Sequence, residues 1–459
     1  MTLLLFLACS SCGVHPTPVV QEAPTVKAPA DAPPLLLVLS LDTTRADALG
    51  LYGGPDEASP NLDALAEQGV VFDWAFSHTS TTLNSHSSLW SGLDPHGHGV
   101  PRNGFVLSPA IDTVPERLHD AGWDTLAVVA ASAVDRSTNL QSGFRIYDDK
   151  LDNARGPRFE APGDAVTERA LALVDQRDTE RPLLLWVHYY DAHSPYEAAP
   201  EWNAPFVDPD YVAPWGDNAL QFVADGVRKG DLDPAALEHL RALYQGEVRF
   251  MDHQIGLLLE GLAERGLLED GYVVVVADHG EMFGEERSSP VGHGPDIDLA
   301  ITHIPSFVVG LGEQALVPAR VEQPVALSDI GSTLVSLAGL DAPLGAGRDL
   351  SPLLQGSETP SAPIFLEASS PWGKEGPAWN NSETERGVVD RGAVYVRNPW
   401  QGTQDLYALE AEQPELDDDK RRQALRRSLA EWDDQAPPFV EEDMSPAVRE
   451  ALQALGYLE

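Results

Sequence analysis

The chain contains short, uninterrupted apolar segments, and two of them end in an acidic residue. LLLVLSLD (residues 35–42) and VVVVAD (residues 273–278) each place a carboxylate where the apolar run stops. Such runs are typical of strands that helices cover on both faces, as in parallel sheets. Segments with helical spacing alternate with them, so the sequence predicts a doubly wound α/β fold with a mostly parallel sheet and helices on both faces. Ligands bind beyond the carboxyl ends of such strands, where Asp42 and Asp278 lie.

The chain of 459 residues divides into four predicted regions. They are a leader (1–12), a Pro/Ala-rich linker (13–34), a catalytic core (35–342) and a C-terminal subdomain (343–459). The predicted core strands are residues 35–42, 125–130, 183–187, 272–277 and 306–309, and the predicted helices include residues 60–68, 114–120, 165–174 and 235–264. In the subdomain, the pattern predicts an antiparallel hairpin over 386–397 with its turn at Asp390-Arg391-Gly392, and a final helix over 445–455.

Both cysteines, Cys9 and Cys12, lie in the leader. The core therefore has no thiol nucleophile and no cysteine zinc cluster. The leader begins with MTLLLFLA, which is shorter than the roughly 20 residues that span a bilayer and is typical of a secretory signal. We expect export to the periplasm or the outer cell envelope. Whether Cys9 or Cys12 carries a lipid that anchors the chain to a membrane stays open.

The charge balance restricts the partners. The chain has 72 acidic and 30 basic residues, a formal net charge of −42. Such a surface repels polyanions, which argues against nucleic acid as a ligand. An anionic substrate must therefore be attracted locally, by a metal ion, a helix N-terminus or placed histidines.

Residues suited to catalysis lie in four separate segments. They are LDTTRAD (41–47), TTLNSHSSLWSG (81–92), WVHYYDAHSPY (186–196) and VVVVADHGEMFGE (273–285), the last followed by GHG at 292–294. Taken singly, Asp42 and Thr82 can be helix caps, and the histidines of the third segment can be ordinary packed residues. Asp278 and His279 are harder to explain in that way, because both are costly to bury unless they are paired or bind a metal.

In their order along the chain these segments resemble the sulfatase family of the alkaline phosphatase superfamily. Further landmarks agree with the same family: SPNLDALAEQGVVFDWAF, YQGEVRFMDHQIG, IPSFVVG and SDIGSTLVSLAGL. The resemblance extends from about Leu35 to the end of the chain. It implies an alkaline-phosphatase-like core with a small C-terminal antiparallel sheet, and an enzyme that cleaves ester bonds with the help of a divalent cation.

The resemblance also implies roles for individual residues. Asp42, Asp278 and His279 would bind one divalent cation, with Thr82 as nucleophile completing its shell. His193 and His293 would face the substrate and either stabilise the ester or protonate the leaving group. The remaining substrate-binding candidates are His86, which stands where sulfatases usually carry arginine, together with Arg45 and His188.

The nucleophile segment departs from the sulfatase pattern. Sulfatases oxidise a cysteine or serine to formylglycine, whereas this chain has Thr82 at that position and Asn84 where the signature has proline. Threonine cannot give the same aldehyde, and a metal-activated threonine suits phosphoryl chemistry. We therefore expect hydrolysis or transfer of phosphate or phosphonate esters through Thr82. The alternatives are a sulfatase that works without formylglycine and an inactive homologue that binds envelope components.

The metal and the substrate stay less defined. Thr43 replaces a second aspartate found in many sulfatases, so the remaining ligands suit Mn²⁺ or Zn²⁺ as well as Ca²⁺. A second metal held by Asp191, His193 and His293 is a further option. The substrate class is a small anionic ester or an ester linked to a glycan or lipid, and the oligomeric state is not predicted.

Overall fold

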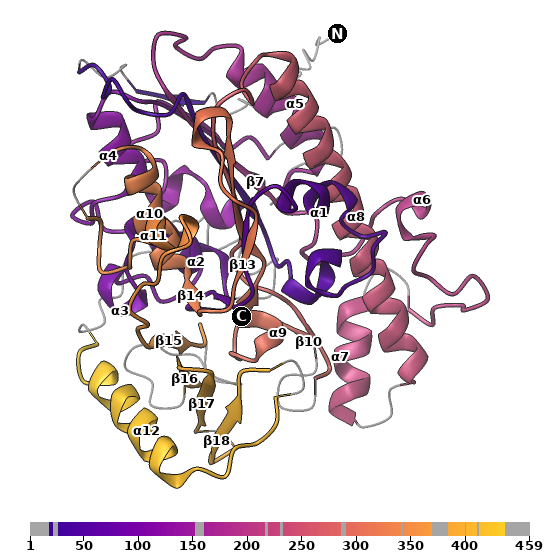
Figure 1. Cartoon of the computed structure of the whole chain (residues 1–459). Coiled ribbons are helices and arrows are strands. Elements are labelled where there is room, and N and C mark those ends of the chain that lie inside the picture. The colour runs from indigo at the N-terminus through magenta and orange to yellow at the C-terminus, as the bar shows by residue number, and fades with distance from the viewer. Residues whose placement is uncertain are drawn as a thin grey trace, which may run out of the picture.

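The computed structural model of the chain (Figure 1) describes residues 18–21, 26–151, 160–215, 219–229, 233–285, 291–340, 343–369, 384–399, 401–410 and 413–436. The predicted final helix over 445–455 and both cysteines lie outside these residues. Within them, no helix has both the length and the apolar character needed to cross a bilayer.

A large central sheet organises the described part of the chain. Its strands, in spatial order, are β1 (Val19–Val20), β6 (Ile146–Asp148), β5 (Asp124–Val128), β7 (Leu183–Tyr189), β2 (Leu35–Leu41), β8 (Gly271–Ala277), β12 (Ser306–Leu311), β3 (Val70–Phe72) and β13 (Ala319–Val321). The five strands from β6 to β8 run parallel to one another. Every residue of β2, β5 and β7 is buried, which is why these strands read as continuous apolar runs. The predicted doubly wound, mostly parallel sheet is confirmed.

One strand runs against the expected direction. The segment predicted over 306–309 forms β12, which pairs antiparallel with both β8 and β3. A continuous apolar run reports burial on two faces and not strand direction, so the pattern could not distinguish the two cases. At the opposite edge, Val19–Val20 of the predicted linker pair with β6, so this part of the linker lies on the sheet.

Helices cover both faces of the sheet (Figure 1). One group consists of α1 (Pro60–Ala66), α5 (Gly163–Val174) and α8 (Pro234–Glu264), and a second of α2 (Thr82–Ser91), α4 (Val114–Asp120) and α10 (Leu327–Leu337). The long helix α8 starts with two strong signals, because Asp233 caps it by accepting a hydrogen bond from the Ala235 amide and Pro234 is its first residue. Helix α2 is buried along its whole length, which places Thr82 in the interior.

A smaller antiparallel sheet follows in the C-terminal region. It contains β15 (Ile364–Glu367), β16 (Arg386–Asp390), β17 (Ala393–Asn398) and β18 (Thr403–Ala408), with α12 (Asp419–Asp433) packed on it. The hairpin forms between β16 and β17, and its turn has two residues with positive φ, Arg391 at 48° and Gly392 at 75°. Helix α12 was not predicted, because its apolar stripe is only three buried side chains in a very charged segment.

Candidate active site

The candidate site lies at the carboxyl ends of β2 and β8. Leu41 and Ala277 are register partners at the ends of these parallel strands, so Asp42 and Asp278 leave the sheet side by side. Both carboxylates are buried, with exposed fractions of 0% and 2%. The strand pairing therefore brings together two negative charges that are 236 positions apart in the sequence.

Hydrogen bonds to Asp278 and Tyr244 hold the conformation of the turn after β2. Thr43 has φ of 46°, in the left-handed region, and its amide donates to Asp278 Oδ1 at 3.1 Å. The carbonyl of Thr43 accepts a hydrogen bond from the Tyr244 hydroxyl at 3.0 Å. The His279 amide also donates to Asp278 Oδ1, at 2.7 Å. One oxygen of Asp278 is thus held by two amides while the other remains free.

The four predicted metal-binding residues each have a buried polar atom with no hydrogen-bond partner among the described residues. These atoms are Asp42 Oδ1, Thr82 Oγ1, Asp278 Oδ2 and His279 Nε2, which we call the strand-end cluster. Asp42, Asp278 and His279 each offer a ligand atom within 4.8 Å of the others. Leaving so many buried groups unpaired is unfavourable unless a ligand completes them. Two carboxylate oxygens, a hydroxyl and an imidazole nitrogen are a donor set that fits a divalent cation.

The electrostatics of the strand-end cluster agree with this fit. Burial, and then the negative charge of Asp278, raise the pKa of Asp42 well above its ordinary value. Burial likewise raises the pKa of Asp278 to about 6. Two adjacent buried carboxylates without a counter-charge are difficult to ionise together. A bound cation would supply that counter-charge and lower both pKa values.

Thr82 is the first residue of α2 and follows Thr81, the extended N-cap residue. Its side chain is 1% exposed and its hydroxyl oxygen belongs to the strand-end cluster. Asn84 joins the helix start to the following loop, because its Nδ2 donates to the Pro101 carbonyl at 2.9 Å and its Oδ1 accepts from the Thr81 hydroxyl at 2.7 Å. The residue that replaces the signature proline therefore helps to hold the candidate nucleophile in place.

The structure places His188 behind Asp42. The Ala130 amide donates to His188 Nδ1 at 3.3 Å, so the ring proton is on Nε2, which lies 3.2 Å from Asp42 Oδ2. This geometry fits a residue that orients a metal-binding carboxylate better than one that contacts substrate.

His86 and Arg45, two other predicted substrate-binding residues, also have protein partners. His86 Nδ1 is 2.8 Å from the Thr82 carbonyl and its Nε2 is 3.1 Å from Ser40 Oγ. Each guanidinium nitrogen of Arg45 donates to a protein oxygen, on Asp47, on Glu285 or on the Glu281 backbone. Both residues therefore support the walls of the site in this structure.

His193 and His293 extend the site outward from the strand-end cluster. The ring centroids of His279 and His293 are 4.5 Å apart, and those of His293 and His193 are 5.1 Å apart. Burial lowers the pKa of His293 to about 4 and that of His193 to about 3, so both rings are neutral near pH 7. An anion bound beside them would favour their protonated forms.

Glu281 is a residue of the site that sequence reasoning missed. It is fully buried, and its Oε1 lies 3.0 Å from His293 Nδ1. Its Oε2 accepts from the Tyr196 hydroxyl at 3.2 Å. Its place three residues after Asp278 in the fourth segment was the available signal. The carboxylate fixes the orientation of His293.

The imidazoles and carboxylates of the described residues form two groups of three that are close enough for one ion. One is the set within the strand-end cluster and the other is His86, His188 and Asp278. In the second group both histidines already have the partners given above. Neither group includes Asp191, His193 and His293, so the option of a second metal there gains no support from the geometry.

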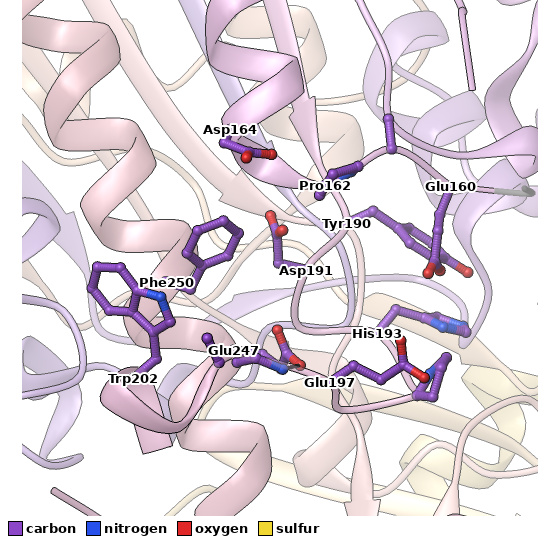
Figure 2. Close-up of a pocket in the computed structure, with 14 residues that line it drawn as sticks. Glu160, Pro162, Asp164, Tyr190, Asp191, His193, Glu197, Trp202, Glu247 and Phe250 are labelled. Carbon is purple, nitrogen blue, oxygen red and sulfur yellow. Dashed lines mark hydrogen bonds between the residues drawn. The ribbon is translucent and has the colours of Figure 1, made fainter. Parts of the chain in front are cut away.

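A pocket of about 420 Å³ opens beside His193 (Figure 2). Trp202 and Phe250 lie at one end of it and His193 at the other. Its acidic lining residues are Glu160, Asp164, Asp191, Glu197 and Glu247. Asp191 accepts a hydrogen bond from the Gly163 amide at 2.7 Å, at the start of α5. The row of three imidazoles thus leads from the strand-end cluster to an acidic and aromatic pocket.

Comparison with known proteins agrees with this geometry. The sulfatase family model matches residues 34–340 of the chain. The chain belongs to the sulfatase family. An arylsulfatase of Clostridium perfringens is 23% identical over 309 residues, which cover 55% of this chain and 64% of that protein. An ulvan-active sulfatase of Formosa agariphila is 26% identical over 345 residues, covering 70% of this chain and 65% of that protein.

The fold of this sulfatase family member is also found in solved structures. The phosphonate monoester hydrolase of Agrobacterium radiobacter superimposes with a TM-score of 0.68 at 22% identity, covering 87% of this chain and 94% of that one. The alignments with the two curated sulfatases cover slightly less than two thirds of their length. The predicted family and fold are confirmed, and the family is that of the predicted ester hydrolases.

Proposed function

We propose that this sulfatase family member is a metal-dependent hydrolase or transferase of phosphate or phosphonate esters, with Thr82 as nucleophile. The observation that carries the proposal is the buried Thr82 hydroxyl. Among the described residues it has no hydrogen-bond partner, as is also true of atoms of two carboxylates and an imidazole beside it. A threonine in this position cannot supply the aldehyde on which ordinary sulfatases depend.

The residues that would hold the cation are Asp42, Thr82, Asp278 and His279. When bound, the cation would lower the pKa of the Thr82 hydroxyl and offset negative charge on the ester. The donor set suits Ca²⁺, Mn²⁺ or Zn²⁺. His188, hydrogen-bonded to Asp42, would hold that carboxylate in a fixed orientation.

The reaction would proceed at phosphorus. Thr82 would release its hydroxyl proton to solvent once the cation has lowered its pKa, and Oγ1 would then form a bond to phosphorus while the bond from phosphorus to the alcohol oxygen breaks. His293, oriented by Glu281, or His193 beside it gives the departing alcohol its proton. Water then attacks the phospho-threonine, releasing phosphate and restoring the Thr82 hydroxyl. An alcohol in place of water would give transfer.

The acidic pocket limits the alcohol part of the substrate. Five of its described lining residues are acidic and none of them is arginine or lysine, so the pocket offers an anion no counter-charge from the described residues. Trp202, Phe250 and Tyr190 offer aromatic faces to a neutral or cationic group. We therefore place an uncharged or amine-bearing alcohol in this pocket, with the anionic ester at Thr82.

Sulfate-ester cleavage without formylglycine is the second candidate, and the sulfatase names of the matching relatives favour it. An inactive envelope-binding homologue is disfavoured, because all four groups of the strand-end cluster are in place. We keep export, and anchoring through Cys9 or Cys12, as proposals.

A substrate panel tests the proposed function. We would assay the full chain on an aryl phosphate, a phosphodiester, a phosphonate and a sulfate with the same leaving group, with each metal in turn. We expect the phosphorus esters to be preferred, Thr82→Ala to abolish turnover, and Thr82→Ser to retain it because the hydroxyl is kept. Mass spectrometry of a quenched reaction should find phosphate on Thr82. Exclusive turnover of sulfate that survives Thr82→Ala would overturn the proposal.

A further inference from the structure

The segment that precedes Thr82, residues 77–81, is attached to the C-terminal sheet, and we call it the nucleophile loop. Thr79 and Glu367 form an isolated parallel bridge, and the Glu367 amide donates to the His78 carbonyl at 2.9 Å. Glu367 is the last residue of β15, the strand at one edge of that sheet. The nucleophile loop therefore runs along the edge of the C-terminal sheet, close to the residues that follow β15.

Three side chains form a closed hydrogen-bonded ring at this junction. The Thr81 hydroxyl donates to Asn84 Oδ1 at 2.7 Å, and Asn84 Nδ2 donates to Ser369 Oγ at 3.0 Å. The hydroxyl oxygens of Ser369 and Thr81 are 2.9 Å apart. A hydroxyl has one proton to donate. Because Thr81 gives its proton to Asn84, Ser369 donates to Thr81, and each of the three bonds then has a donor and an acceptor. We call these three side chains the Ser369 ring.

The Ser369 ring is buried and takes the place of an ordinary helix cap. Thr81 is 3% exposed, Ser369 1% and Asn84 0%. Thr81 is the N-cap residue of α2, yet its side chain makes no capping hydrogen bond to a helix amide. Removing one hydroxyl from a buried ring leaves the other members without a partner, because water does not replace it there. The start of α2 therefore depends on Ser369.

The ring also accounts for the departure from the sulfatase signature at Asn84. Proline would restrain the backbone of the first turn by fixing its φ angle. Asparagine has no such restraint, but its side chain both accepts and donates, which proline cannot do. Through Ser369 and Thr81, this side chain ties the first turn of α2 to the C-terminal sheet.

The backbone of Ser369 extends the connection to the His293 segment. Its amide donates to Ser80 Oγ at 3.0 Å, and the Ser80 hydroxyl donates to the Gly294 carbonyl at 2.6 Å. Gly294 directly follows His293 and has φ of 109°, a conformation that favours glycine. One residue of the C-terminal region thus contacts the loop before Thr82 and, through Ser80, the backbone next to His293.

We propose that Ser369 is a positioning residue, through which the C-terminal sheet sets the orientation of Thr82 for attack. The proposal rests on the proposed function in that Thr82 is the attacking group. Thr82 directly follows the ring member Thr81, so the direction of its side chain depends on the backbone that the ring restrains. Misplacing an attacking group by about 1 Å can cost on the order of 10²-fold in rate.

The competing explanation is that the ring only stabilises the fold. A purely stabilising contact lowers the melting temperature and the amount of folded protein, and it leaves kcat per folded molecule unchanged. A positioning contact lowers kcat while KM stays nearly constant, because substrate still binds and the attacking oxygen is misplaced. The two explanations therefore differ in kcat and not in stability.

Steady-state kinetics of the full chain distinguish them, with the ester and metal that give turnover in the substrate panel. Ser369→Ala should lower kcat roughly 10- to 100-fold, with little change in KM and a melting temperature only a few degrees lower. The matched control is Ser332→Ala on α10, which removes a buried hydroxyl that donates to the Leu344 carbonyl at 2.7 Å. It should lower the melting temperature to a similar extent and leave kcat within about twofold of wild type.

Variants of Thr81 test whether the three side chains act as one ring. Thr81→Val removes the hydroxyl and should lower kcat as Ser369→Ala does, whereas Thr81→Ser keeps the hydroxyl and should retain most of the activity. The double variant Thr81→Val with Ser369→Ala should be no more than about twofold slower than the slower single variant, because either change already opens the ring.

Amide hydrogen exchange tests the ring separately from the chemistry. Ser369→Ala should speed exchange at the start of α2, residues 82–86, at least about tenfold, and Ser332→Ala should not. If wild type turns over no ester and forms no phospho-threonine, the proposed function fails while this measurement still reports on the ring.

Two results would overturn the role of Ser369. In one, Ser369→Ala has the kcat and the exchange rates of the Ser332→Ala control, which leaves only a stabilising contact. In the other, the losses of Thr81→Val and Ser369→Ala multiply in the double variant, so that the two hydroxyls act independently. If Ser369→Ala does not fold, the comparison of Thr81→Val with Thr81→Ser decides, and equal kcat in these two variants counts against the ring.

Discussion

Two clusters of charged groups in the interior of this molecule have opposite electrostatics. The strand-end cluster leaves four polar atoms without partners. The second, which we call the interface network, consists of His96, Glu367, Arg386 and Asp433 and joins the C-terminal region to the core. Glu367 accepts from Arg386 Nη2 at 2.7 Å and lies 3.0 Å from His96 Nε2, and Arg386 also donates to Asp433 at 2.9 Å.

The pKa values separate the two clusters. Burial opposes ionisation of Glu367, yet the charge of Arg386 and the contact with His96 lower the pKa of this carboxyl below its ordinary value. In the strand-end cluster burial and a second carboxylate raise the pKa of Asp42 instead. The interface network carries its own counter-charges, whereas the strand-end cluster has to receive them. Burial of charge alone therefore does not mark a functional site. What distinguishes the strand-end cluster is that several unpaired ligand atoms lie close together in it.

The largest expected effect is the loss of activity on removing one charge of the strand-end cluster. Asp278→Asn keeps the oxygen that accepts from the Thr43 and His279 amides but removes a charge that we propose binds the metal. We expect turnover to fall by at least ~10³-fold. Metal-free Asp278→Asn should melt at or above the temperature of metal-free wild type, because repulsion with Asp42 is relieved. Turnover assays and calorimetry after chelation check both. If metal-free Asp278→Asn is much less stable than metal-free wild type, the charges of the strand-end cluster are already compensated by protein groups, as they are in the interface network.

The reverse result is expected in the interface network. Arg386→Met leaves Glu367 buried without its main partner, and removing one member of a buried ion pair costs about 3–5 kcal/mol. Denaturant unfolding should measure that loss, while the turnover per folded molecule stays within a few-fold of wild type. The matched double variant Arg386→Met with Glu367→Gln should recover part of the stability. Equal stability of single variant and wild type would contradict the contrast.

The positions of β2, β5, β7, β8 and β12 were predictable because these strands are buried on both faces and are therefore continuous apolar runs, whereas the short strands β1, β3, β6 and β13 were not predicted. The antiparallel direction of β12 was not, since direction depends on connections that an apolar run does not encode. Helix α12 (Asp419–Asp433) was not predicted for another reason. Its buried face is Leu425, Leu429 and Trp432, a narrow stripe in a segment otherwise rich in charge.

The sequence predicted the part of the site that lies directly at the ends of the strands. Asp42 and Asp278 follow neighbouring parallel strands, so their proximity follows from the topology. The partners of His86 and His188 could not be predicted, because they depend on Ser40, the Ala130 amide and one oxygen of Asp42, which only the packed side chains bring together. Spacing along the chain does not report such contacts.

A smaller effect on activity is expected at Glu281, which contacts His293 next to the strand-end cluster. Glu281→Gln removes the charge that orients His293, and we expect kcat/KM to fall roughly 10- to 100-fold with little change in melting temperature. Tyr196→Phe is the matched control, because it removes the other contact of Glu281 and leaves His293 in place. Steady-state kinetics across pH, on substrates with good and poor leaving groups, should show the Glu281→Gln loss mainly with poor leaving groups. Identical behaviour of the two variants would remove Glu281 from the reaction.

The last effect concerns Glu247, a buried carboxylate in the acidic pocket that lies outside the strand-end cluster and has no cationic partner among the described residues. Burial, and then the negative charge of Asp191, raise its pKa to about 9. Because the folded-state pKa is above the unfolded one, the folded state takes up a proton, and stability falls as pH rises from about 4.5 towards 9. Glu247→Gln keeps the acceptor for the Ala198 amide and should be equal in stability to wild type near pH 4 and more stable at pH 8, with a difference that grows as the pH rises. Melting curves across pH measure the difference, with the exposed Glu197→Gln as control. If Glu247→Gln gives no gain in stability at pH 8, Glu247 is ionised and its charge is balanced by a bound cation. Glu247 would then resemble the carboxylates of the strand-end cluster and would not be a protonated acid.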